Sequence, residues 1–141
     1  MKPWHSVAVP HRDIREGRFD ESIFAASLSD VVAGRGPLEY RDAATFFQKT
    51  YPTQGLVNLL TAIVGRLAGT GRGEPVIQVQ TPFGGGKTHA LVALYHLLQS
   101  AQDLTDADAV EQVLAQSGAR AVPQARVVAF DGTVADPLGR T

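Results

Sequence analysis

Hydrophobic residues recur at three- and four-residue spacing along several stretches of the chain, a pattern that predicts amphipathic helices. In the longest stretch, Thr53 is suited to cap the helix and the glycines of residues 69–73 end it. The apolar face of this helix comprises Leu56, Leu59, Leu60, Ile63, Val64 and Leu67. A second helix is expected from Asp20, its N-cap, through residue 32, with Gly34 just past its end.

Three further helices follow from the same reasoning. Asp42 is expected to cap a short helix that runs toward Tyr51. Residues 91–98 are apolar over most of a helical circumference, which is typical of a helix packed between a sheet and another layer. Residues 105–108 resemble a capping box and predict a helix that ends near Gly118.

Two short runs are rich in β-branched residues and predict strands. Residues 75–80 precede a glycine-rich turn, and residues 125–130 read as a buried strand. Strands that alternate with helices favour an α/β fold with a parallel sheet. The glycine-rich turn between the strands ends in Lys87 and Thr88 and leads into a helix, which is the order of a phosphate-binding loop. We therefore expect residues 1–74 to form an arm and helices, and residues 75–141 to form the first strands of an incomplete P-loop NTPase domain, truncated before its acidic strand.

The turn after the first predicted strand ends in Lys-Thr. Gly84, Gly85 and Gly86 adopt positive φ angles at little cost, so that successive backbone N–H groups can point toward one anion. The first turn of the next helix adds unpaired N–H groups and the positive end of its dipole. Strand, glycine-rich turn, Lys-Thr and helix follow in the order of a phosphate-binding loop, so residues 84–89 are predicted to bind ATP.

Two side chains of this loop carry the predicted chemistry. Lys87 is expected to hold an oxygen between the β- and γ-phosphates and to neutralise charge that develops on the γ-phosphate, which makes it the catalytic candidate. The chain has three lysines and ten arginines, so composition alone would favour arginine over lysine at position 87. Thr88 is expected to bind Mg²⁺ through its hydroxyl. His89 is expected to contribute its backbone amide.

The loop departs from the motif G-x-x-x-x-G-K-[ST] at its first position, where this chain has Thr81. That glycine serves the turn out of the strand and contributes little to the phosphate amides, so loss of binding does not follow. The alternative interpretation is a glycine-rich hairpin or helix entry that carries an ordinary surface lysine.

Composition narrows the function classes. A net charge of −1 gives no general attraction to nucleic acid or to a membrane surface. The absence of cysteine excludes disulfides, thiolate metal sites and a cysteine nucleophile within these residues. No stretch has the apolar length of a signal peptide or of a membrane span, so a cytoplasmic protein is expected.

Asp131 follows the second predicted strand, as the magnesium-organising acid does in P-loop ATPases. Two features weigh against that role: Gly132 stands where such enzymes often have a water-polarising Glu, and this is the first strand after the loop helix. Asp131 is therefore predicted to cap the strand end, with a metal role as the alternative. The acidic and water-activating residues are then expected beyond Thr141, in a longer protein of which this chain is the N-terminal part.

Residues 10–21 and 80–90 together resemble the start of a family of large prokaryotic proteins described as predicted AAA-type ATPases of unassigned function. Thr81 in place of glycine looks typical of that family. Its members are similar to components encoded beside adenine-specific DNA methyltransferases in phage-defence systems. The resemblance implies a methyltransferase or another defence protein as partner; DNA contact and a homo-oligomer stay open.

Three functions remain as alternatives from the sequence. The first is Mg²⁺-dependent ATP hydrolysis by the full-length protein, with the fragment alone inactive. The second is an ATP-gated scaffold that binds the nucleotide without appreciable hydrolysis. The third, a small-molecule kinase, is disfavoured because about 75 residues of largely helical sequence precede the loop.

Overall fold

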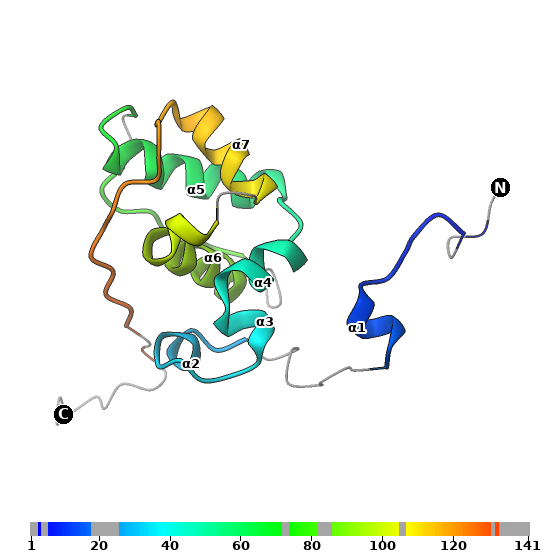
Figure 1. Ribbon diagram of the computed structural model, residues 1–141. Helices are drawn as coiled ribbons and strands as arrows, with labels where there is room; N and C mark the ends of the chain where they lie inside the picture. The colour runs from blue at the N-terminus through cyan, green and yellow to red at the C-terminus, as the bar shows by residue number, and fades with distance from the viewer. Residues whose placement is uncertain are drawn as a thin grey trace, which may run out of the picture.

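The chain folds into a body of packed helices in the computed structural model, which describes residues 3, 6–17, 26–71, 74–81, 86–104, 107–130 and 132 (Figure 1). The helices are α1 (Arg12–Arg15), α2 (Leu28–Val32), α3 (Leu38–Arg41), α4 (Ala43–Lys49), α5 (Gln54–Leu67), α6 (Lys87–Gln99) and α7 (Asp108–Ser117), with a 3₁₀ turn, η3 (Ala101–Asp103), between α6 and α7. Figure 1 shows α1 on an arm that stands apart from this body.

One hydrophobic core joins the helices from both halves of the chain. Helix α5 packs along α7, while α6 contacts both α2 and α4. The largest side chains with almost no exposed surface are Phe46, Leu60, Leu97 and Leu104. Fully burying one such side chain contributes about 1.5–3 kcal/mol, so the contacts between helices hold this body together.

The caps of two helices confirm their predicted starts. The Asp42 side chain accepts a hydrogen bond from the Thr45 backbone N–H at 2.8 Å and begins α4. The Thr53 hydroxyl accepts from the Leu56 N–H at 3.3 Å and begins α5. These bonds satisfy donors that have no partner inside a helix, which is why both helices begin there.

Helix α7 ends as predicted, at Gly118, whose φ of 68° requires glycine for an unstrained turn. Its start differs from the prediction. The N-cap is Ala107, which provides no capping side chain, and the predicted capping residues Thr105 and Asp106 lie outside the described residues.

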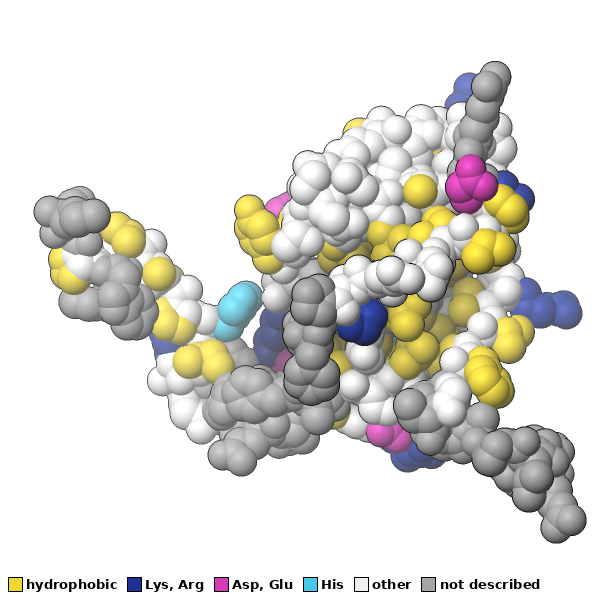
Figure 2. All heavy atoms as spheres, turned by 180° about the vertical axis from the view of Figure 1, so that it is seen from behind, with side chains coloured by type: hydrophobic (Ala, Val, Ile, Leu, Met, Phe, Trp, Pro, Cys, Tyr) yellow, Lys and Arg dark blue, Asp and Glu magenta, His cyan; other side chains and the backbone are white. Residues whose placement is uncertain are grey.

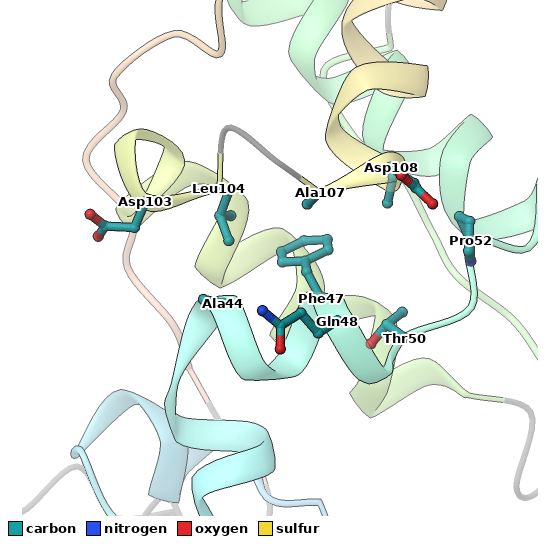
Figure 3. Close-up of a pocket in the computed structure, with 10 residues that line it drawn as sticks. Ala44, Phe47, Gln48, Thr50, Pro52, Asp103, Leu104, Ala107 and Asp108 are labelled. Atoms are coloured by element: carbon teal, nitrogen blue, oxygen red, sulfur yellow. The ribbon is translucent and has the colours of Figure 1, made fainter. Parts of the chain in front are cut away.

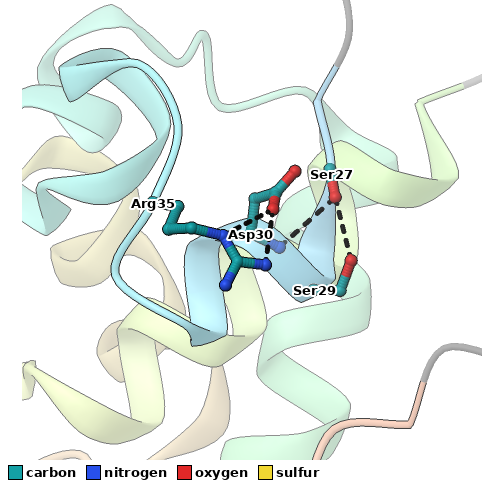
Figure 4. A network of polar contacts seen from close by, with 4 residues as sticks. All are labelled: Ser27, Ser29, Asp30 and Arg35. Atoms are coloured by element: carbon teal, nitrogen blue, oxygen red, sulfur yellow. Dashed lines mark hydrogen bonds and ion pairs between the residues drawn. The ribbon is translucent and has the colours of Figure 1, made fainter. Parts of the chain in front are cut away.

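The helix predicted from Asp20 to residue 32 is only partly described, because residues 18–25 lie outside the described part. Helix α2 begins after Ser27, whose extended backbone interrupts any helix that would pass through it. The Ser27 hydroxyl accepts from the Asp30 N–H, and Arg35 donates to Asp30 Oδ1 at 2.9 Å from one guanidinium nitrogen (Figure 4). This hydrogen bond from Arg35 lowers the pKa of the Asp30 carboxyl.

The predicted α/β fold is wrong for the described residues: they contain helices and no β-strand, so the parallel sheet of an incomplete P-loop NTPase domain is not formed there. In the two runs predicted as strands, 75–80 and 125–130, residues 76–80 and 125–130 have no regular structure and Pro75 lies in a bend. A strand needs a neighbour to accept its backbone hydrogen bonds, and neither segment has one among the described residues.

The prediction that residues 125–130 are buried is also wrong. Val128 and Phe130 are 86% and 80% exposed, and in the earlier segment Val76 is 79% exposed. Figure 2 shows hydrophobic side chains exposed on the face of the molecule opposite to that of Figure 1. None of the described helices is both long and apolar enough to cross a lipid bilayer.

Candidate functional site

A cavity of about 710 Å³ lies where the start of α5, residues 78–81 and the start of α6 meet. Its volume falls within the usual range of small-molecule sites, roughly 300–1,000 Å³. Its wall combines apolar residues, among them Leu56, Leu59, Val79 and Ala90, with polar residues that include Gln78, Gln80, Thr81, Lys87 and His89. The cavity therefore offers both apolar and polar surface to one ligand.

Gly86 starts α6 with a φ of 78°, a left-handed conformation that side-chain-bearing residues rarely adopt. Its carbonyl accepts the Ala90 N–H at 2.9 Å, which is the first hydrogen bond of the helix. Gly86 provides no capping side chain. Residues 87–89 form the first turn of α6, where the hydrogen bonds within the helix have not yet begun. This turn presents the positive end of a 13-residue helix beside the cavity.

Lys87 joins the start of α6 to residues 78–81. Its ammonium donates to the Thr81 carbonyl oxygen at 3.0 Å and to the Thr81 hydroxyl at 2.9 Å. Both residues line the cavity, and Lys87 is exposed to solvent. Thr81 replaces the expected glycine of the motif, and its hydroxyl gives Lys87 a second acceptor that glycine would not provide.

His89 lies one helical turn from Gly86 and packs among aromatic rings. Its ring centroid is 4.6 Å from that of Phe46, and its Nε2 is 3.1 Å from the Thr50 hydroxyl. Because the Thr50 hydroxyl donates its hydrogen to the Phe46 carbonyl at 2.7 Å, it accepts from His89, which places the ring hydrogen on Nε2. Burial lowers the pKa of His89, so the neutral ring is favoured.

Tyr51 lies on the cavity wall with 82% of its surface exposed, whereas Phe46 and Phe47 before it are buried in the core. The sequence leaves two interpretations of the aromatic cluster Tyr40, Phe46, Phe47 and Tyr51, a cover over adenine or core packing, and favours core packing because such side chains usually fill interiors. One sequence signal distinguishes Tyr51 from the buried phenylalanines. Helix α4 ends before Tyr51, Pro52 disfavours a helical backbone at the residue before it, and Thr53 caps α5, so Tyr51 lies in the connection between the two helices.

The predicted site residues are only partly brought together. Gly86, Lys87 and His89 line the cavity. Thr88 is half-buried on the same helical turn and is not among the residues that line it. Gly84, Gly85 and Asp131 lie outside the described residues.

A second cavity, of about 400 Å³, lies between α4 and the segment from η3 to α7 (Figure 3). In Figure 3 the Phe47 ring points into it, while the Asp103 carboxylate points away. It contains none of the predicted site residues, although its wall includes Thr50, the partner of His89. Nowhere in the described part of the chain do three or more His, Asp or Glu side chains gather as metal ligands would.

Comparison with known proteins gives a family and no named relative. No curated protein and no solved structure matches the chain. Residues 5–128 match the DUF499 N-terminal domain, a span that includes all the described residues of the 710 Å³ cavity. The chain therefore belongs to the DUF499 family, as a member of its N-terminal domain.

Proposed function

We propose that this chain binds ATP at the 710 Å³ cavity, with the phosphates at the start of α6. The observation that carries the proposal is the meeting of three anion-binding features in one place. These are the ammonium of Lys87, the left-handed turn at Gly86 and the N-terminus of a long helix. The proposal does not depend on a parallel sheet.

The phosphate end follows from the charges around Lys87. A triphosphate is a strong hydrogen-bond acceptor with several negative charges, and it is stabilised by an ammonium and by the positive end of a helix dipole. The Lys87 ammonium now donates to two neutral oxygens of Thr81. A charged phosphate oxygen is a stronger acceptor than either, so exchange of these bonds for phosphate favours binding.

The proposal includes a Mg²⁺ ion beside the phosphates. Mg²⁺ keeps most of its waters and needs only one or two protein oxygens beside the phosphates. In this proposal the Thr88 hydroxyl, on the first turn of α6, takes one of those positions. Since Thr88 does not line the cavity, Lys87 is the residue on which the test is made.

The proposal is limited to binding. None of the described residues on the cavity wall is Asp or Glu, the residue types that usually activate the attacking water. The side chains that line the cavity therefore agree best with an ATP-gated scaffold, which binds the nucleotide without appreciable hydrolysis. Hydrolysis by a full-length protein, and a partnership with a DNA methyltransferase or another defence protein, are proposals that rest on the family resemblance alone.

The test is calorimetric titration of the chain with Mg·ATP. We expect Lys87→Ala to weaken binding by about tenfold or more, because a hydrogen bond to a charged group contributes roughly 1.5–3 kcal/mol. Arg120→Ala is the matched control: it removes one exposed cation away from the cavity and should leave the affinity unchanged. Equal affinity of the Lys87→Ala variant and the unaltered chain, or no binding at all, would refute the proposal.

A further inference from the structure

Tyr51 is an exposed aromatic side chain whose backbone is held firmly. Its carbonyl accepts a hydrogen bond from the Thr53 N–H at 2.8 Å, and Pro52 between them has a fixed φ. Thr50, on the other side, is buried and bonded to the Phe46 carbonyl. The backbone of Tyr51 is therefore held at one point of the surface, while its ring is exposed and not packed in the core.

The same contacts place Tyr51 near the proposed phosphate end. Thr50, its chain neighbour, accepts the hydrogen bond from His89, and His89 is two residues after Lys87 in α6. Tyr51 is thus linked to Lys87 through its neighbour Thr50 and the hydrogen bond of Thr50 with His89. Both side chains line one cavity.

The apolar side chains of the same cavity suit a flat ring. Leu56 and Leu59, from the first turns of α5, line the cavity together with Val79 and Ala90. These four side chains offer apolar contact to the face of a ring, while the amides of Gln78 and Gln80 on the same wall can donate to or accept from the edge of any base. An aromatic face is the usual platform for a nucleobase, because every base has a π-face that stacks on it.

We infer that Tyr51 stacks on the nucleobase of the bound nucleotide and makes the site a binder of nucleoside triphosphates generally. This inference rests on the proposed function and adds to it the base end of the site. Recognition through the ring face predicts that ATP and GTP bind with affinities within a few fold of each other. It also predicts that the base contributes a share of the affinity that inorganic triphosphate lacks.

The experiment compares Mg·ATP with magnesium tripolyphosphate, which keeps the phosphates and lacks the base. We expect Tyr51→Ala to weaken ATP binding by about tenfold and to leave tripolyphosphate binding unchanged, since stacking on one base is worth roughly a factor of 5 to 150. Tyr51→Phe should retain ATP affinity. Phe130→Ala is the matched control, because Phe130 is as exposed as Tyr51 but lies away from the cavity.

The outcomes separate this inference from the proposal beneath it. If Lys87→Ala weakens both ligands and Tyr51→Ala weakens neither, the inference is overturned and the proposed function stands. If Tyr51→Ala weakens both ligands equally, the ring has a structural role and the inference is overturned as well. Absence of binding by either ligand to the unaltered chain overturns the proposed function and the inference together.

Discussion

Helix α5 and residues 125–130 both carry strong apolar patterns, yet only the helix buries its side chains. In α5, Leu60 and Val64 have no exposed surface, whereas Val128 and Phe130 in the second segment are mostly exposed. A helix makes its backbone hydrogen bonds within itself, so an amphipathic pattern is sufficient to form it once a core is available. A strand depends on a neighbour, and the described residues provide none.

Residues 76–80, beside the cavity, also have the composition of a strand without forming one. Val76 is 79% exposed and Ile77 is 41% exposed, so this run does not enter the core, although its composition is that of a strand. Its C-terminal end nevertheless matters, because Thr81 binds Lys87 through two hydrogen bonds. The segment is positioned by its contact with α6 rather than by pairing in a sheet.

The largest expected effect contrasts two phenylalanines, one from each region. Phe46→Ala removes a ring that is 1% exposed and should lower the free energy of unfolding by about 3–5 kcal/mol. Phe130→Ala should change it by no more than about 0.5 kcal/mol. Urea unfolding followed by circular dichroism measures both.

If Phe46→Ala does not fold, the milder Phe46→Leu serves the same purpose and should still cost more than Phe130→Ala. Similar losses for the variants at positions 46 and 130 would mean that residues 125–130 are buried in solution, contrary to the structure.

A proline substitution tests the backbone of the two regions without removing buried surface. Ala62 is exposed in the middle of α5, and Ala62→Pro should cost about 3 kcal/mol or more because it removes a helical hydrogen bond and introduces a clash. Val128→Pro should cost about 0.5 kcal/mol or less, since no strand ladder includes it. A loss at position 128 that approaches the loss at position 62 would indicate that this segment donates a ladder hydrogen bond. Denaturant midpoints of the two variants settle the comparison.

The smallest effect concerns pH and the packed start of α6. Because burial lowers the pKa of His89 in the folded chain, the unfolded chain, with an ordinary pKa near 6.5, binds the proton more readily. The stability that His89 contributes is therefore complete above about pH 6.5 and is lost as the pH falls through its folded pKa. His89→Gln should reduce the loss of stability between pH 7.5 and pH 5.5.

The matched control for this experiment is His11→Gln, which replaces a histidine on the exposed arm and leaves the packed start of α6 intact. Thermal unfolding of the three proteins at both pH values measures the difference. An unchanged slope in His89→Gln would show that His89 is solvated in the folded state.

Part of the candidate site could be read from the sequence. Gly86 and Lys87 stand out because a glycine-rich turn before a helix has few uses, and both of these residues line the cavity. The sequence could not separate Tyr51 from Phe46 and Phe47: all three stand in an aromatic cluster for which core packing is favoured over a cover on adenine, and only its exposure distinguishes Tyr51. The bond between Thr50 and His89 joins residues that are 39 positions apart, a pairing that no local pattern encodes.

The sequence by itself determined where helices α4 and α5 begin and where α7 ends, because Asp42, Thr53 and Gly118 act on backbone groups within a few residues of themselves. Tertiary structure decided whether the β-branched runs would pair, which side chains line the cavity and how His89 meets Thr50. Those outcomes depend on contacts between distant segments, whose free energy is shared among many side chains and appears only when the helices pack.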